Sequence, residues 1–314
     1  MAKKKIPQIV KEVRNKIKRD IDWGNEKLVS YSQFSMFNEC PKKWSLQYKE
    51  GHKQFTSNIH TVFGSAIHLV VQTYLDAMYE QSNPKADALD LDSLFEEELR
   101  KEYMVQYKKN GNKHFLEPGD LQEAYEDGLE IIDYLKKNKS KYFSKRGWHL
   151  IGCEIPITLN PDPKLNNVVY QGYLDVVLYN ENTNRIKIID IKGSMAGWKD
   201  SHKKDENKQF QLILYKKFFS EYFDFPIDNI DIEFLILKRK VYESEDFYIK
   251  RFQTFIPPSG KIKLKKAITA FDNFIESAFD KNGYKQVDHQ PIENKNCEWC
   301  SFYKTYLCKA THES

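Results

Sequence analysis

The stretch from Val168 to Lys192, VVYQGYLDVVLYNENTNRIKIIDIK, constrains the fold more than any other part of the chain. Two apolar runs rich in β-branched residues flank a polar loop of Asn, Glu and Thr, and this pattern predicts a β-hairpin. If the hairpin is symmetric about that loop, Tyr179 faces Ile186, and Asp175 lies directly opposite Asp190. Like charges that face each other across a strand pair destabilise it unless a cation lies between them or one carboxyl is protonated. The hairpin therefore predicts two carboxylates on one face of a sheet.

The next residues add a cation to that face. Successive side chains of a strand point to opposite faces, so Lys192 shares the face of Asp190 while Ile191 is turned to the core. Two carboxylates on adjacent strands form a hard-oxygen site suited to Mg²⁺ or Mn²⁺. Such an ion can activate water and stabilise charge on a phosphodiester, while a lysine positions the nucleophile or the phosphate. An ordinary Asp190–Lys192 salt bridge on a solvated face is the alternative, and the acid-x-Lys triplet alone favours it.

Apolar spacing elsewhere in the chain predicts the remaining elements. Helices are expected at residues 6–21, 61–79, 205–222 and 261–279, several more over 85–145, and strands at 148–159, 232–237 and 247–256. Within the helical region, the lysine-rich run KKNKSKYFSKRG at 136–147 is expected to form a loop. The order of helices, three strands, a helix and a strand predicts an α/β (mixed α+β) fold, with a mixed central sheet flanked by helices.

Cysteine usage bounds the chemistry of the chain. There are five cysteines, and the positively charged N-terminal segment has no apolar stretch like that of a signal peptide. The chain also lacks an apolar run of about 18 residues, so we expect a cytoplasmic protein without a membrane segment. An odd number of cysteines in such a chain argues against a disulfide framework and favours metal ligation. Cys153, inside a predicted strand, is expected to be a buried structural residue.

Short motifs together resemble the PD-(D/E)XK nuclease superfamily, and its RecB-type branch in particular. They are Gly-Tyr-Leu-Asp ending at Asp175, Ile-Ile-Asp-Ile-Lys-Gly containing Asp190 and Lys192, and Gln211 followed four residues later by Tyr215. The RecB-type branch also carries a histidine on an upstream helix, and Gly-Ser-Ala-Ile-His ending at His68 matches its form. The resemblance implies a restriction-endonuclease-like core.

The resemblance also implies a role for each motif residue. The ligands of the Mg²⁺ or Mn²⁺ ion would be His68, Asp175, Asp190 and the carbonyl of Ile191. Lys192 would serve the attacking water. Gln211 and Tyr215 stand at positions i and i+4, so one helix face can present both toward the site; a polar rim on a packed helix is an equal alternative. Glu154, on the preceding strand, is a weaker candidate for an acid that some relatives carry there.

Four of the cysteines extend the resemblance. Cys297, Cys300 and Cys308 lie near the C-terminus, and Cys40 lies 257 residues before Cys297. RecB-type nucleases with an iron–sulfur cluster, including the CRISPR-adaptation nuclease and the AddB subunit of bacterial recombination complexes, likewise place one cysteine before the core and three after it. The resemblance implies a [4Fe–4S] cluster that ties the two chain ends together as a staple. The gap of seven residues between Cys300 and Cys308 is longer than usual for that group, and Zn²⁺, which accepts the same thiolates, is the alternative.

The resemblance divides the chain into five expected segments. They are a basic amphipathic helix (1–28), a helical part with Cys40 and His68 (29–80), a helical insertion (81–146), the nuclease core (147–256), and a C-terminal helix with three cysteines (257–314). The basic residues of the first segment are expected to form a solvated face, with a phosphate-contacting arm as the alternative. The lysines expected to steer a phosphate backbone toward the metal, unless they only form a solvated loop, are Lys199, Lys203, Lys204 and Lys208.

Taken together, these features lead us to expect a divalent-metal-dependent DNA nuclease, and more specifically an exonuclease on single-stranded DNA or DNA ends. Recombination, repair or phage DNA processing is the expected setting, in a bacterial cytoplasm or in the host cytoplasm for a phage protein, with a helicase or recombinase as a possible partner. The net charge of +4 gives no argument of its own for nucleic-acid binding. One alternative is a catalytically silent nuclease-fold protein that binds DNA or a partner, with a cysteine-ligated structural metal; another is a zinc-stapled structural protein.

Overall fold

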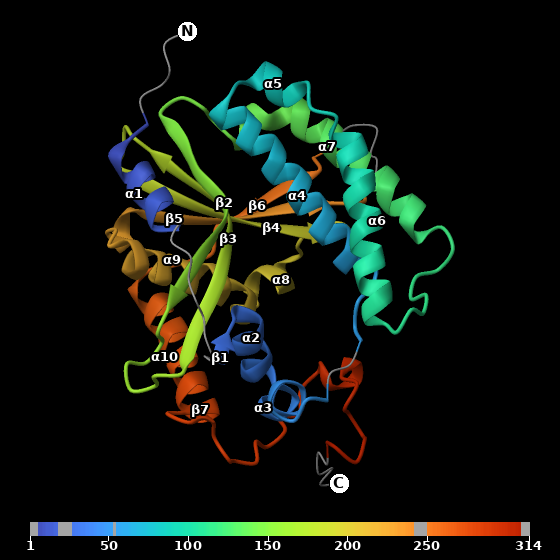
Figure 1. The fold of residues 1–314 in the computed structure, drawn as a ribbon, viewed down its shortest axis with the longest axis vertical. Helices are drawn as coiled ribbons and strands as arrows, with labels where there is room; N and C mark the ends of the chain where they lie inside the picture. The colour runs from blue at the N-terminus through green and yellow to red at the C-terminus, as the bar shows by residue number, and fades with distance from the viewer. Residues whose placement is uncertain (1–5, 18–26, 53–54, 242–249, 309–314) are drawn as a thin grey trace.

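The computed structural model describes residues 6–17, 27–52, 55–241 and 250–308, and a mixed sheet lies at their centre (Figure 1). The six strands are β1 (Lys27–Val29), β2 (Trp148–Leu159), β3 (Val168–Asn180), β4 (Arg185–Ser194), β5 (Ile230–Lys238) and β6 (Phe252–Phe255). Their order is β1-β3-β4-β5-β6, and β2 pairs with the opposite edge of β3. The β1–β3 and β4–β5 pairs are parallel, whereas the other pairs are antiparallel.

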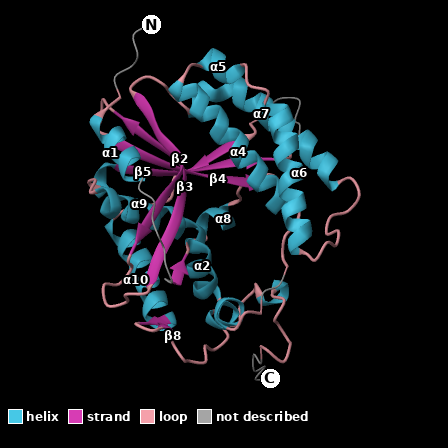
Figure 2. Cartoon of the chain, in the orientation of Figure 1, coloured by secondary structure: helices cyan, strands magenta, loops and turns pink. Residues whose placement is uncertain are grey.

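Helices cover both faces of this sheet (Figure 2). The helices over Ile189 and Ile191 are α4 (Ile59–Glu80), α6 (Leu91–Lys109) and α7 (Asp120–Tyr142). The helices over Ile186 and Ile188 are α2 (Tyr31–Glu39), α9 (Glu206–Phe223) and α10 (Lys261–Ala278). The shorter elements are α1 (Gln8–Ile17), α3 (Pro41–Trp44), α5 (Asn83–Asp87), α8 (Asp200–Lys204), η1 (Ser45–Lys49), η2 (Ile227–Asn229), η3 (Cys297–Trp299), β7 (Phe279–Asp280) and β8 (Gly283–Tyr284). The mixed sheet flanked by helices is the architecture expected from the sequence. None of the described helices is long and apolar enough to cross a membrane.

Most elements lie where apolar spacing predicts them, but of the loop expected at residues 136–147 only residues 143–147 form a loop. Residues 136–142 continue α7. Their lysines point to the surface, where Lys137 pairs with Asp133 at 2.7 Å and Lys139 with Asp87 at 2.9 Å, so the helix accommodates the charge. The expected helix at 6–21 is described only as far as Ile17, and residues 247–249 of the expected last strand also lie outside the described part.

Helix α1 is fixed to the sheet by its own basic side chains. Arg14 pairs with Glu80 at the end of α4 at 2.5 Å and donates to the carbonyl of Ile151 in β2 at 2.9 Å. Lys16 lies 4.4 Å above the ring of Tyr222 in α9. These two cations therefore hold the helix in place, which leaves them unsuited to a free phosphate-contacting arm.

Helix α4 is held against the sheet through α7. Asp127 of α7, only 4% exposed, pairs with the equally buried Arg239 directly after β5 at 2.9 Å. The guanidinium of Arg239 also lies 4.9 Å above the ring of Phe63 in α4. Gly128 allows the ring of Phe95 to pack on the backbone of α7, since a Cβ there would come within 2.0 Å of that ring. A buried ion pair and close helix packing thus fix the helix that carries His68.

The sheet forks along one edge of β3. Strand β1 pairs with that edge at Val168–Tyr170, whereas β4 pairs with it only from Val176 onward. Between these positions, no described strand pairs with that edge of residues 171–175. The ladder matches Tyr179 with Ile186, as predicted, and ends at Val176 opposite Ile189. The next residues in this register are Asp175 and Asp190, so both carboxylates lie at the mouth of the fork.

Candidate active site

Both aspartates are engaged at the mouth of the fork. Asp190 is 1% exposed, and its Oδ2 lies 2.8 Å from Nζ of Lys192. Asp175 Oδ2 accepts a hydrogen bond of 2.7 Å from the backbone N–H of Ile191, just beyond the end of the β3–β4 ladder. Nδ1 of His68 lies 3.7 Å from the same oxygen. The structure therefore brings together the histidine, both acids and the lysine selected from the sequence.

Besides His68, helix α4 contributes Gln72, which the sequence motifs did not indicate. Gln72 stands one turn after His68, is 6% exposed, and donates from Nε2 to Glu154 Oε1 at 2.6 Å and to the carbonyl of Asp175 at 3.1 Å. Glu154 has φ +50°, a strained backbone for a non-glycine residue in mid-strand. It occupies the position between the β2–β3 pairs that flank Asp175. The only signal for Gln72 in the sequence was its position four residues after His68.

Helix α9 borders the site from the other face of the sheet. Gln211 Nε2 lies 3.4 Å from the hydroxyl of Tyr215, so one helix face presents both residues. Burial raises the pKa of Tyr215, and the negative charge of Asp190 raises it further, which indicates that the phenol faces the acids. The same causes act on Tyr31 of α2, a residue that the motifs gave no reason to select. Gln211 and Tyr31 both line a cleft beside Lys192.

The electrostatics of the site leave it with excess negative charge. Burial raises the pKa of Asp175 and of Asp190 to about 6, although Lys192 opposes the shift. Burial alone would lower the pKa of Lys192, but the two carboxylates outweigh it and raise that pKa. Burial and the charge of Lys192 lower the pKa of His68, which keeps the imidazole neutral and able to ligate a metal. At neutral pH two carboxylates therefore face one ammonium.

A divalent cation fits this donor set, although the ligands are not gathered around one point. Within residues 6–17, 27–52, 55–241 and 250–308, no three His, Cys, Asp or Glu side chains form a group that could hold a metal ion. Instead, the ammonium of Lys192 pairs with the carboxylate of Asp190, and the backbone N–H of Ile191 donates to the carboxylate of Asp175. Hard oxygens with surplus negative charge attract Mg²⁺ or Mn²⁺. An ion held by Asp175, Asp190 and His68 would take over the charge compensation that Lys192 now provides.

A comparison with family models identifies the chain. The model of the PD-(D/E)XK nuclease superfamily matches residues 28–305, from β1 into the cysteine segment. The chain belongs to this superfamily. Membership indicates a metal-dependent nuclease, a hydrolase of phosphodiester bonds, and Mg²⁺ or Mn²⁺ is the typical cofactor of the superfamily. A search of curated proteins finds no significant match.

The four lysines near this PD-(D/E)XK core differ in their surroundings. Lys208 lines the cleft beside Lys192. Lys203 lies 3.8 Å from Asp200 within α8, and Lys199 and Lys204 are exposed at the two ends of that helix. Only Lys208 among the four therefore adjoins the site directly.

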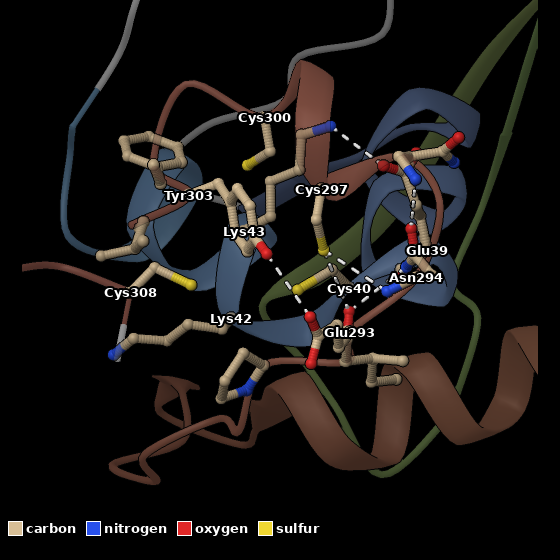
Figure 3. Close-up of a pocket in the computed structure, with 15 residues that line it drawn as sticks. Glu39, Cys40, Lys42, Lys43, Glu293, Asn294, Cys297, Cys300, Tyr303 and Cys308 are labelled. Atoms are coloured by element: carbon tan, nitrogen blue, oxygen red, sulfur yellow. Dashed lines mark hydrogen bonds and ion pairs between the residues drawn. The ribbon is translucent and has the colours of Figure 1, made fainter. Parts of the chain in front are cut away.

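The cysteines of this PD-(D/E)XK protein meet at a second place. Cys40, between α2 and α3, lines one pocket together with Cys297, Cys300 and Cys308, and Figure 3 shows the four side chains around it. Asn294 joins the two chain segments, since its Nδ2 donates to the carbonyl of Glu39 at 3.1 Å. Thiols from both ends of the chain thus share a pocket, which fits a thiolate-bound metal group. Within the described residues, however, they do not form a group that could hold a metal ion.

Cys153 lies apart from that pocket. Its Sγ is 3.9 Å from the carbonyl of Gln72, and burial raises the pKa of its thiol to about 12. The residue as a whole is partly buried, whereas the sequence led us to expect a buried one.

The raised carboxyl pKa values predict that Asp175→Asn stabilises the metal-free protein. In the folded protein the carboxyl of Asp175 keeps its proton up to a pH of about 6, whereas in the unfolded chain it loses that proton near pH 3.8. The free energy of unfolding therefore falls as the pH rises through this range. Urea unfolding in EDTA at pH 7.5 should show a gain of about 1–2 kcal/mol for the variant, which shrinks at pH 5. Asp231→Asn, which removes an acid that is half exposed and paired with Arg185, should show no such gain. A less stable Asp175→Asn at pH 7.5 would contradict the raised pKa.

Proposed function

We propose that this chain is a Mg²⁺- or Mn²⁺-dependent deoxyribonuclease of the RecB-type branch, acting as an exonuclease on single-stranded DNA or DNA ends. The observation that carries the proposal is the meeting of His68, Asp175, Asp190 and Lys192 at the fork of the sheet. A salt bridge on a solvated face would not require Asp190 to be buried. Nor would it require a histidine from an upstream helix to approach the neighbouring acid.

The roles of the side chains follow from their positions. Asp175, Asp190, His68 and the Ile191 carbonyl would hold the cation, which when bound supplies Lewis acidity and an acidified water. Lys192, released from Asp190, would orient the water or the phosphate with its ammonium group. Gln211 and Tyr215 border the same space from α9 and can hydrogen-bond to substrate. Lys208 can attract the phosphate backbone into the cleft, with Lys199, Lys203 and Lys204 as more distant positive charge.

The preference for ends and the biological setting rest on the resemblance to RecB-type nucleases. We propose a role in DNA recombination, repair or phage DNA processing, in the cytoplasm of a bacterium or of a phage-infected host. A helicase or recombinase partner would supply strand separation, because the sequence has no G-x-x-x-x-G-K-[ST] phosphate loop of its own.

We further propose that the chain is organised into the five segments expected from its sequence, with the nuclease core at residues 147–256.

In the pocket lined by cysteines, we propose that a [4Fe–4S] cluster is bound by Cys40, Cys297, Cys300 and Cys308. Their shared pocket joins α2 and α3 to the segment after α10, two parts of the chain more than 250 residues apart (Figure 3). Closing so long a loop constrains the unfolded chain, so the cluster would stabilise the fold without taking part in hydrolysis. Zn²⁺ on the same thiolates is the alternative occupant.

The proposed function makes a prediction for hydrolysis. End-labelled linear DNA, single-stranded and duplex, should be degraded with Mg²⁺ or Mn²⁺ and remain intact in EDTA, while circular DNA persists. Asp190→Ala should lower the rate by roughly 10³-fold or more, because a metal contributes several kcal/mol to transition-state stabilisation. Asp231→Asn, another acid of the sheet, should remain active. Cleavage that survives Asp190→Ala would disprove the mechanism, and cleavage of circular DNA would disprove the preference for ends.

The proposed cluster makes a prediction for the cysteines. Protein purified without oxygen should be brown and contain about four iron and four sulfide ions per chain. Cys300→Ser should lose the colour and melt at a lower temperature, whereas Cys153→Ser should keep both properties because Cys153 lies outside the pocket. Colourless protein with stoichiometric zinc would identify the alternative occupant. An unchanged melting temperature and metal content in Cys300→Ser would exclude a metal group at this pocket.

A further inference from the structure

A cleft of about 360 Å³ opens directly beside Lys192. Its walls combine aromatic rings, cations and small polar groups, and the lining residues that matter here are Tyr31, Ser35, Trp198, His202, Lys208 and Gln211. The volume falls within the range of pockets that hold small organic ligands. Aromatic rings next to basic and hydroxyl groups match the two parts of a nucleotide, a flat base and an anionic phosphate.

The indole of Trp198 is held in place in the wall of this cleft. Its ring packs on Phe234 of β5, with centroids 4.9 Å apart. Its backbone N–H donates to Gln253 Oε1 at 2.7 Å, and Gln253 Nε2 donates back to its carbonyl at 3.1 Å. Gly197 permits this turn, because it has φ +94° and a Cβ there would lie 2.9 Å from Gln253 Oε1. The ring is therefore positioned before any ligand arrives, which lowers the entropic cost of stacking.

A cation stands next to the indole. Nζ of Lys208, from the first turn of α9, lies 5.9 Å from the centroid of the Trp198 ring. Its acidic neighbour, Asp205, is 3.7 Å away, and both side chains are 41% exposed, so this ion pair leaves the ammonium open to a phosphate. Ser35 and Gln211 add a hydroxyl and an amide to the lining of the same cleft.

We propose that this cleft binds the single nucleotide next to the scissile phosphate, with its base stacked on Trp198 and its phosphate against Lys208. The ligand class is a nucleoside monophosphate, either as the terminal unit of a strand or as the released product. The inference rests on the proposed nuclease function and adds a substrate-binding site to it. Stacking does not distinguish strongly among bases, so the site would accept any base.

Calorimetric titration of the full-length protein with dAMP in EDTA tests the site without catalysis. The wild type should bind dAMP, and Trp198→Leu should weaken binding roughly tenfold or more because stacking is lost. Trp198→Phe should restore most of the affinity. Trp299→Leu, which removes an indole that is 82% exposed on the cysteine segment, should bind like the wild type. Deoxyribose 5-phosphate, which has no base, should bind equally to the wild type and Trp198→Leu but more weakly to Lys208→Met.

Several outcomes would overturn the inference. They are an absence of dAMP binding to the wild type, equal binding by Trp198→Leu, and equal weakening by Trp299→Leu. If Trp198→Leu fails to fold, as judged by thermal melting, Lys208→Met and Trp198→Phe decide the question with the same ligands. Binding through Trp198 by a protein that cleaves no DNA would disprove the proposed function alone. Metal-dependent cleavage by a protein whose nucleotide binding ignores Trp198 would disprove this inference alone. A short oligonucleotide that binds far more tightly than dAMP would identify the strand end as the ligand.

Discussion

The burial of two carboxylates against one ammonium is the interaction on which the rest of the structure depends. Asp190 and Lys192 pair inside the sheet, and Asp175 lies across the fork from them. Charges removed from water are costly unless each is compensated, and here one negative charge remains in excess. Such an arrangement lowers stability and persists where the charge has a use, as in the binding of a cation. The fold therefore holds a charge imbalance that a divalent metal would correct.

The fork explains why this imbalance can exist in the middle of a sheet. Because β4 leaves β3 after Ile189, the N–H of Ile191 is free to bond the carboxylate of Asp175. The same opening admits His68 from α4 on one face and the side chains of α9 from the other. The buried ion pair between Asp127 of α7 and Arg239 helps to hold α4 in place. One irregularity in strand pairing thus creates both the site and the access to it.

The sequence was sufficient for the hairpin, because two apolar runs rich in β-branched residues flank a central polar loop, and a symmetric loop pairs Tyr179 with Ile186, as observed. It was also sufficient for α9, whose apolar residues recur at helical spacing. It could not reveal the three-residue strand β1, the lysine-rich end of α7, Gln72 or Tyr31. Short strands carry too little pattern, surface lysines are compatible with helix and loop alike, and polar residues acquire partners only through long-range packing. The cleft at Trp198 likewise depends on contacts with Gln253, distant in sequence.

The central claim is that the fork binds a catalytic divalent cation. X-ray diffraction from crystals soaked in Mn²⁺, with an anomalous difference map, tests it most directly. The excess negative charge of the two carboxylates predicts a manganese peak within bonding distance of Asp175 and Asp190. The ammonium of Lys192 should then have moved away from Asp190. A map without manganese between the two carboxylates, in which Asp190 and Lys192 remain paired at saturating Mn²⁺, would contradict it.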